Sequence, residues 1–170
     1  YGIGAVIDIL VTMDELVSVT GTPTITLETG AADAVVSYSG ATATPLTVLT
    51  FQYTVSALEA SGDLDYELIG SLLLAGGTIN DAAANTAILT LVLPGNAGSI
   101  SDDQAVVIDG VLPTVVGVTS SAADGSYGLA QSMDILVTVD ELVTVTGTPT
   151  ITLETGGTDA IVSYSGANAT

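Results

Sequence analysis

The sequence contains no lysine, arginine or histidine, and this absence excludes several classes of function. Nucleic-acid binding depends on cations that face the phosphates, so neither DNA nor RNA is expected as a partner. Because cysteine is absent as well, the chain lacks the usual zinc ligands, the Cys or His of nucleophilic triads, and the Lys of a Schiff base or a Ser-Lys dyad. With no tryptophan and one phenylalanine, a sugar-cleaving cleft is also poorly supplied. We therefore predict that the protein is not an enzyme.

The charged residues that are present are all acidic. Nineteen Asp and Glu residues give a formal net charge of −19, and no side-chain cation is available to pair with any of them. Solvent or a bound metal must therefore supply the compensating charge. Without cysteine no disulfide can stabilise the fold, even outside the cell. Hydrophobic residues make up 48% of the chain, which indicates a folded core rather than disorder.

Residues 1–44 and 127–170 are two copies of one sequence, aligned without a gap. They differ at 11 of the 44 positions, mostly by mild exchanges such as Met13 to Val139. The repeat period is therefore 126 residues. A repeat of this kind indicates tandem copies of one structural unit. The glycosylation sequon Asn168-Ala-Thr170 is not a feature of the repeat, because the first copy has Thr42 at that position.

The repeat predicts how the chain is organised. We expect residues 1–110 to be one repeat that lacks its first strand, and residues 111–170 to be the first strand and leading half of the next. The segment Val111–Ser126 precedes the second copy but has no counterpart ahead of Tyr1. Two alternatives follow: the sequence is part of a much longer array, or it is a subunit whose missing strand comes from a neighbouring copy.

Period-two alternation of apolar and polar residues predicts an all-β fold. Turn signals separate short strands, which is typical of a Greek-key β-sandwich. Residues 88–93 are almost wholly apolar and suit a central strand covered on both faces, whereas Leu68–Leu74 fits either a strand or a short helix. The expected strands lie at 7–13, 17–27, 34–38, 46–56, 66–74, 88–93, 105–108, 113–120, 133–139, 143–153 and 160–164.

Several runs resemble a known family of repeats. They include VTGTPTITLETG at 19–30, Phe51–Val55, Asp63–Tyr66, Thr78–Asn85 and Val107–Val115. These runs are similar to the bacterial Ig-like, or cadherin-like, repeats of giant extracellular adhesins and surface fibre proteins. The stretch Asp81–Asn85 is similar to the Asp-Ala-Ala-Gly-Asn turn of that family, with Ala84 in place of glycine. The resemblance implies Ig-like Greek-key β-sandwich repeats in tandem, an extracellular or cell-surface location, and calcium as a bound ion.

Acidic residues in loops and turns are the candidate calcium ligands. Calcium prefers six to eight oxygens from carboxylates, amides, carbonyls and water. The opposing interpretation for each acid is a solvated or turn-forming side chain, since Asp is favoured in turns for its backbone hydrogen bonds. No complete EF-hand pattern is present. The candidates are Asp63, Asp65, Asp81, Asp109, Asp124, Glu15 and Glu141.

Two hypotheses of function follow. The leading one is a structural repeat of an extracellular filament, matrix or giant surface adhesin, stabilised by calcium, whose partners are neighbouring copies joined by strand exchange. The alternative is a lectin-like Ig module that binds a glycan or another cell-surface ligand. Sugar platforms need exposed aromatic rings, and Tyr38, Tyr53 and Tyr66 are predicted to lie in strand cores instead. The uncharged segment 82–101 is interrupted by Asn85, Pro94 and Gly95, so no membrane span is expected.

Overall fold

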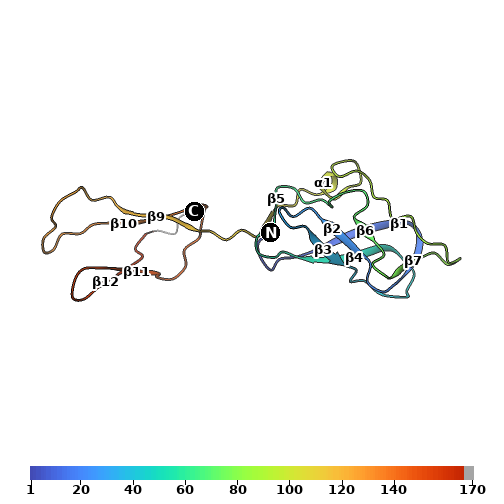
Figure 1. The fold of residues 1–170 in the computed structure, drawn as a ribbon, viewed down its shortest axis with the longest axis horizontal. Coiled ribbons are helices and arrows are strands. Elements are labelled where there is room, and N and C mark those ends of the chain that lie inside the picture. The colour runs from blue at the N-terminus through green and yellow to red at the C-terminus, as the bar shows by residue number, and fades with distance from the viewer. Residues whose placement is uncertain (167–170) are drawn as a thin grey trace. The chain divides into compact units, whose positions relative to one another are not determined.

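A computed structural model describes residues 1–166 and is nearly all β (Figure 1). The chain forms two compact units, Tyr1–Leu112 and Pro113–Thr170. The predicted all-β class is confirmed: the strands pair in antiparallel sheets, and the one helix among residues 1–166 is the four-residue α1, Ile100–Asp103. The sequon at Asn168 lies outside the described residues.

The first sheet of the larger unit is built on β1, Val6–Thr20, a strand of 15 residues. On one edge β1 pairs antiparallel with β4, Leu46–Thr54, from Val6 opposite Thr54 to Thr12 opposite Val48. The register then shifts between Thr12 and Val17. On the other edge β1 pairs with β7, Thr78–Asn80, only over Ser18–Thr20. The strand order is β4-β1-β7.

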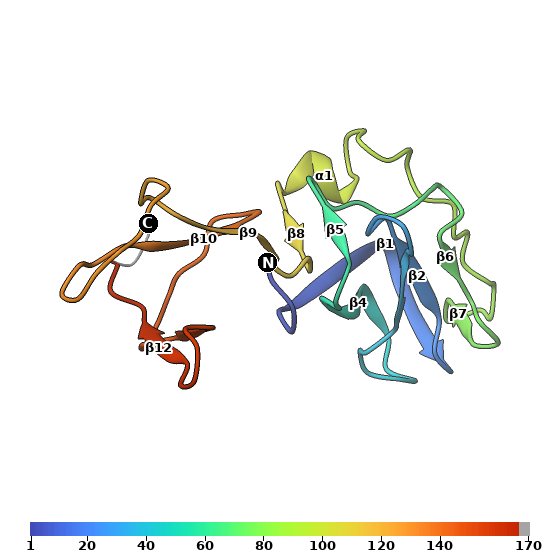
Figure 2. The ribbon, with the colours of Figure 1, turned by 60° about the vertical axis from the view of Figure 1, so that its left-hand side comes forward.

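The second sheet of this unit has the order β3-β2-β6. Its strands are β2, Thr24–Leu27, β3, Ala34–Ser37, and β6, Leu72–Leu73. A third, two-stranded pair joins β5, Ala60–Ser61, to β8, Ile108–Asp109, and lies close to α1 (Figure 2). These short pairings bring the end of the unit back beside its beginning, where the Asp109 amide donates to the Tyr1 carbonyl at 2.9 Å.

Side chains from both three-stranded sheets meet in one core. The alternation read from the sequence decides which of them point inward: Phe51, Tyr53 and Val55 are at most 2% exposed, as predicted. The rings of Tyr38 and Phe51 pack edge to face with centroids 5.7 Å apart. The predicted burial of the tyrosines is confirmed. The buried core comprises Ile9, Val17, Val19, Ile25, Leu27, Val36, Tyr38, Leu49, Phe51, Tyr53, Val55, Leu64, Tyr66, Leu72, Ile79 and Ile108.

The smaller unit contains two separate hairpins. In one, β9, Val115–Ser120, pairs antiparallel with β10, Ile135–Val139. In the other, β11, Thr150–Leu153, pairs with β12, Ala160–Ser163. From Pro113 to Gly166 no described residue is buried. This unit therefore has strands but no core.

Several predicted strands differ from the structure: 143–153 is a strand only at β11, Thr150–Leu153, and 105–108 overlaps only β8, Ile108–Asp109. The prediction of a central strand at 88–93 is wrong: no strand forms there, and Ile88 is 86% exposed. The segment is extended, but only a few of its backbone groups find partners, such as the Leu91 amide, which donates to the Ile69 carbonyl at 2.9 Å. For Leu68–Leu74, the structure places a turn followed by β6, with the Ser71 amide donating to the Leu68 carbonyl.

Across the described part of the chain, no helix has the length and apolarity needed to cross a membrane, in agreement with the expected absence of a span.

Core packing on β4 generates a prediction. Leu49 is fully buried, whereas its neighbour Val48 is 40% exposed. We expect Leu49→Ala to lower the free energy of unfolding by about 2–5 kcal/mol, because it leaves a cavity between the sheets. Val48→Ala, on the same strand but the opposite face, should cost less than about 1 kcal/mol. Urea unfolding of both variants measures the difference, and equal losses would contradict the assigned register.

Candidate functional site

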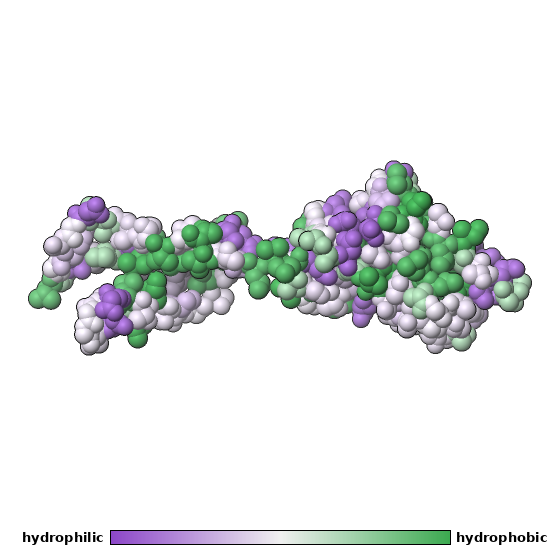
Figure 3. Space-filling model, viewed as in Figure 1, coloured by the Kyte–Doolittle hydropathy of each residue, from purple (hydrophilic) through white to green (hydrophobic). Residues whose placement is uncertain are grey.

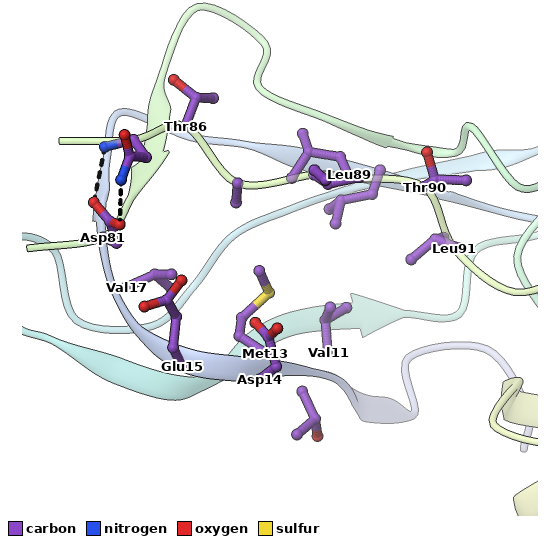
Figure 4. Close-up of a pocket in the computed structure, with 15 residues that line it drawn as sticks. Val11, Met13, Asp14, Glu15, Val17, Asp81, Thr86, Leu89, Thr90 and Leu91 are labelled. Carbon is purple, nitrogen blue, oxygen red and sulfur yellow. Dashed lines mark hydrogen bonds between the residues drawn. The ribbon is translucent and has the colours of Figure 1, made fainter. Parts of the chain in front are cut away.

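A groove runs along the larger unit between β1 and the extended segment 85–91 (Figure 4). Its volume is about 460 Å³. One wall comes from β1 on either side of its register shift, and the facing wall comes from the chain that follows β7. Leu72 of β6 contributes to the lining as well. The groove is lined by Val11, Thr12, Met13, Asp14, Glu15, Val17, Leu72, Asp81 and residues 85–91.

The inner surface of the groove is apolar and only partly covered. Val11 and Met13 of β1 face Leu89 and Leu91 across it (Figure 4). All four pack against the core yet remain half-exposed, and so does Ala87. In the space-filling view, apolar residues gather where β1 and β6 lie (Figure 3). The core is thus open at this place, and further apolar side chains would complete it.

The backbone of β1 is also unpaired along the groove. Thr50 accepts a hydrogen bond from the Ser39 amide at 2.9 Å, so its peptide groups point away from β1. Leu10 lies directly opposite Thr50 and must also point its peptide groups away from β4. The same alternation applies to Thr12. These groups face the edge that β7 leaves free, and an open strand edge of this kind is a template for pairing with another strand.

Polar side chains mark one end of the groove. Asp81 accepts two hydrogen bonds from Asn85, one from the amide nitrogen and one from the side chain, each 2.8 Å long (Figure 4). These bonds hold the pKa of Asp81 below its ordinary value. Glu15 lies at the same end, on the β1 side (Figure 4). The groove therefore has an apolar inner surface and one acidic end, formed by Glu15 and Asp81.

Asp65, one of the predicted calcium ligands, is a buried hydrogen-bond acceptor. It is 7% exposed and accepts from the amides of Tyr66 at 2.9 Å, Gly95 at 3.0 Å and Ile100 at 3.3 Å, and from the Ser101 hydroxyl at 2.6 Å. Burial alone would raise the pKa of Asp65, but these donors lower it below the ordinary value. Asp65 thereby ties the chain around α1 to the core.

The other predicted ligands are not buried as Asp65 is. Asp63 is exposed and accepts a 3.3 Å bond from the Val106 amide, and Asp109 accepts one of 3.3 Å from the Val111 amide. Asp124 and Glu141 are exposed residues of the smaller unit. Within residues 1–166 no three acidic side chains converge as a metal cluster. The five candidates of the larger unit therefore form no cluster of three carboxylates, and calcium binding stays a prediction.

Sequence reasoning named Glu15 and Asp81 but missed the apolar residues that form the groove. Val11 and Met13 resembled any other inward-facing positions of a strand, and Leu89 and Leu91 were assigned to a fully covered strand. One signal was available: Ile9–Met13 repeats almost unchanged at Ile135–Val139, so a strand that pairs with the second segment is a candidate neighbour for the first.

Comparison with known proteins returns no relative: no family model, no curated protein and no solved structure matches the chain. Function must therefore be inferred from the repeat, the groove and the charge.

The hydrogen bonds of Asp65 generate a prediction. Asp65→Asn replaces an acceptor oxygen by a donor facing buried N–H groups, and we expect a loss of about 2–3 kcal/mol in the free energy of unfolding. Asp63→Asn is the matched control, with an expected loss below about 0.5 kcal/mol because its side chain is exposed. Chemical denaturation of both variants at neutral pH checks this, and equal losses would contradict the assigned role of Asp65.

The same site predicts a dependence on pH. Because the folded-state pKa of Asp65 is depressed, its contribution is present above the unfolded pKa and is lost as pH falls through the folded value. As pH falls, the free energy of unfolding of the parent should therefore approach that of Asp65→Asn.

Proposed function

We propose that this chain is a structural repeat of an extracellular filament, matrix or giant surface adhesin, built from tandem β-sandwich units of Ig-like Greek-key type. The observation that carries the proposal is a hairpin formed twice. In β2–β3, Thr24 lies opposite Ser37 and Leu27 opposite Ala34. In β11–β12, the residues 126 positions later pair in the same register, Thr150 with Ser163 and Leu153 with Ala160.

Details of the two hairpins agree beyond their register. The Tyr38 amide donates to the Pro23 carbonyl at 2.8 Å, and the Tyr164 amide donates to Pro149 at the same distance. In each turn a glycine with φ above 100° follows the same Glu-Thr pair: Gly30 at 105° and Gly156 at 108°. This left-handed conformation favours glycine. The second copy thus repeats the local structure even where no core supports it, as expected of a unit used many times.

The composition supports a structural role outside the cell. A spacer or fibre needs the same contacts repeated rather than a catalytic cleft, and the sequence supplies near-identical copies without Cys, His or Lys. The absence of Lys and Arg also removes every cleavage site for trypsin-like proteases. The high negative charge favours solubility of an extended assembly.

Completing the repeat tests the proposal. Copying Val111–Ser126 directly ahead of Tyr1 restores the 126-residue period. We expect the added strand to cover the groove and to raise the free energy of unfolding by about 2–4 kcal/mol, since two valine side chains become buried. The melting midpoint should rise by several degrees, and hydrogen exchange at the Leu10 and Thr12 amides should slow.

The matched control for this test carries the same extension with the copied Val115 and Val118 replaced by serine. It should show little of the gain. If the native extension leaves both the midpoint and the exchange of Leu10 and Thr12 unchanged, the tandem-sandwich proposal is wrong.

Calcium stabilisation of the array is tested separately, with the completed repeat melted in CaCl₂ and in EDTA. A specific site at a thousandfold excess over Kd adds about 4 kcal/mol to the free energy of unfolding. NaCl at matched ionic strength is the control, because screening of the −19 charge alone also stabilises the folded state. An equal rise in NaCl would remove calcium from the proposal.

A further inference from the structure

We infer that the groove beside β1 takes the strand Val115–Ser120 of a second copy of this chain, inserted antiparallel to β1. The inference rests on the proposed function as a repeat unit and deepens it by naming the partner strand and its register. The repeat itself provides a template, because β9 pairs with β10, which is the counterpart of this part of β1.

The template is the β9–β10 hairpin. β10 has the sequence Ile-Leu-Val-Thr-Val, and its counterpart Ile9–Met13 in β1 differs at the last residue alone. In the hairpin, Val137 lies opposite Val118, and Ile135 lies opposite Ser120. Carried back by 126 residues, the same register places Val118 of the incoming strand opposite Val11 and Ser120 opposite Ile9.

The backbone groups have the right orientation for this pairing. The Asp140 amide donates to the Thr114 carbonyl at 3.1 Å, so the even-numbered residues of β10 turn their peptide groups toward β9. Their counterparts in β1 are Leu10, Thr12 and Asp14. Leu10 and Thr12 are the residues whose peptide groups face the open edge. The free hydrogen-bonding groups of β1 are therefore the counterparts of the groups with which β10 binds β9.

The side chains of the incoming strand match the groove. Val115 and Val118 lie opposite Val139 and Val137, so they point to the same side of the sheet as those residues. In the groove this side holds Met13 and Val11, which are half-exposed. In their own unit Val115 and Val118 are 62% and 54% exposed, because that unit has no core. Transfer into the groove would bury apolar surface on both partners.

A polar contact fixes the register at the end of the strand. Asp140 accepts from the Thr114 amide at 2.8 Å and from its hydroxyl at 2.6 Å. The counterpart of Asp140 is Asp14, which lines the groove and is exposed. Insertion of β9 would place Thr114 of the incoming chain against Asp14 in the same way.

Charge favours this segment as the point of contact between copies. Each chain carries a net charge of −19, so two chains repel each other over most of their surfaces. The stretch Val111–Ala123 has no charged residue. A neutral strand can therefore approach the acidic end of the groove in another chain at a lower electrostatic cost than a segment that carries Asp or Glu.

Disulfide trapping tests the inference, because the natural chain has no cysteine. Val11 and Val118 would form a non-hydrogen-bonded pair, in which the Cα atoms are about 4.5 Å apart and a disulfide can close. We expect an oxidised mixture of Val11→Cys and Val118→Cys chains to give a linked dimer. A mixture of Leu10→Cys with Val118→Cys should not, because Leu10 points to the opposite face and is 61% exposed. Each variant alone controls for random oxidation.

A third variant distinguishes a strand that comes from a second chain from a strand that belongs to the same chain. Copying Val111–Ser126 ahead of Tyr1 in the Val11→Cys chain covers the groove, and the dimer with Val118→Cys should then disappear. Persistence of the dimer, or equal linkage through Leu10→Cys, would overturn the inference. If the extension stabilises the chain but the parent mixture gives no dimer, the inference is wrong while the repeat-unit function stands. If the extension also leaves stability and exchange unchanged, both are wrong.

Discussion

Backbone pairing along β1 is the constraint on which the rest of the structure depends. The strand holds β4 over its first half and β7 over its last three residues, and its inward side chains Ile9, Val17 and Val19 are at the centre of the core. On the edge that β7 occupies, the residues of β1 ahead of Ser18 pair with no other strand among residues 1–166. The groove and the half-exposed Val11 and Met13 lie along this free stretch.

The acidic side chains show how a chain without cations accommodates its charge. Where an aspartate is held in place, backbone amides, hydroxyls or a side-chain amide replace the usual lysine or arginine. Asp65 accepts three amides and a hydroxyl, Asp81 accepts from Asn85, and Asp140 accepts from Thr114. These donors lower the pKa of all three carboxyls, so the groups stay ionised without a counter-ion from another side chain. The remaining acids are exposed, apart from the half-buried Glu59, which accepts from the Tyr53 hydroxyl at 2.8 Å.

Local pattern predicted the hairpins well and the long-range contacts poorly. Thr24–Leu27 and Ala34–Ser37 lie within the predicted strands because alternation and a glycine turn are local properties. Asp63 and Asp65 looked equivalent in the sequence, yet Asp65 is buried and Asp63 is exposed. The difference is made by Gly95 and Ser101, which lie 30 and 36 positions after Asp65 in the sequence and donate hydrogen bonds to it. Residues 88–93 have a strand composition, but a strand requires a neighbour with which to form hydrogen bonds.

The sequence by itself determined the 126-residue repeat, the all-β class, the inward set of β4 and the absence of side-chain ion pairs, because these depend on residue identity and short-range spacing. Only the tertiary structure decided which strand edges stay open. β1 and the second copy of its sequence differ at few positions, yet β1 extends over 15 residues and β10 over 5. A strand exists only as far as its partners extend. β1 has β4 and β7 beside it, whereas β10 has β9 alone.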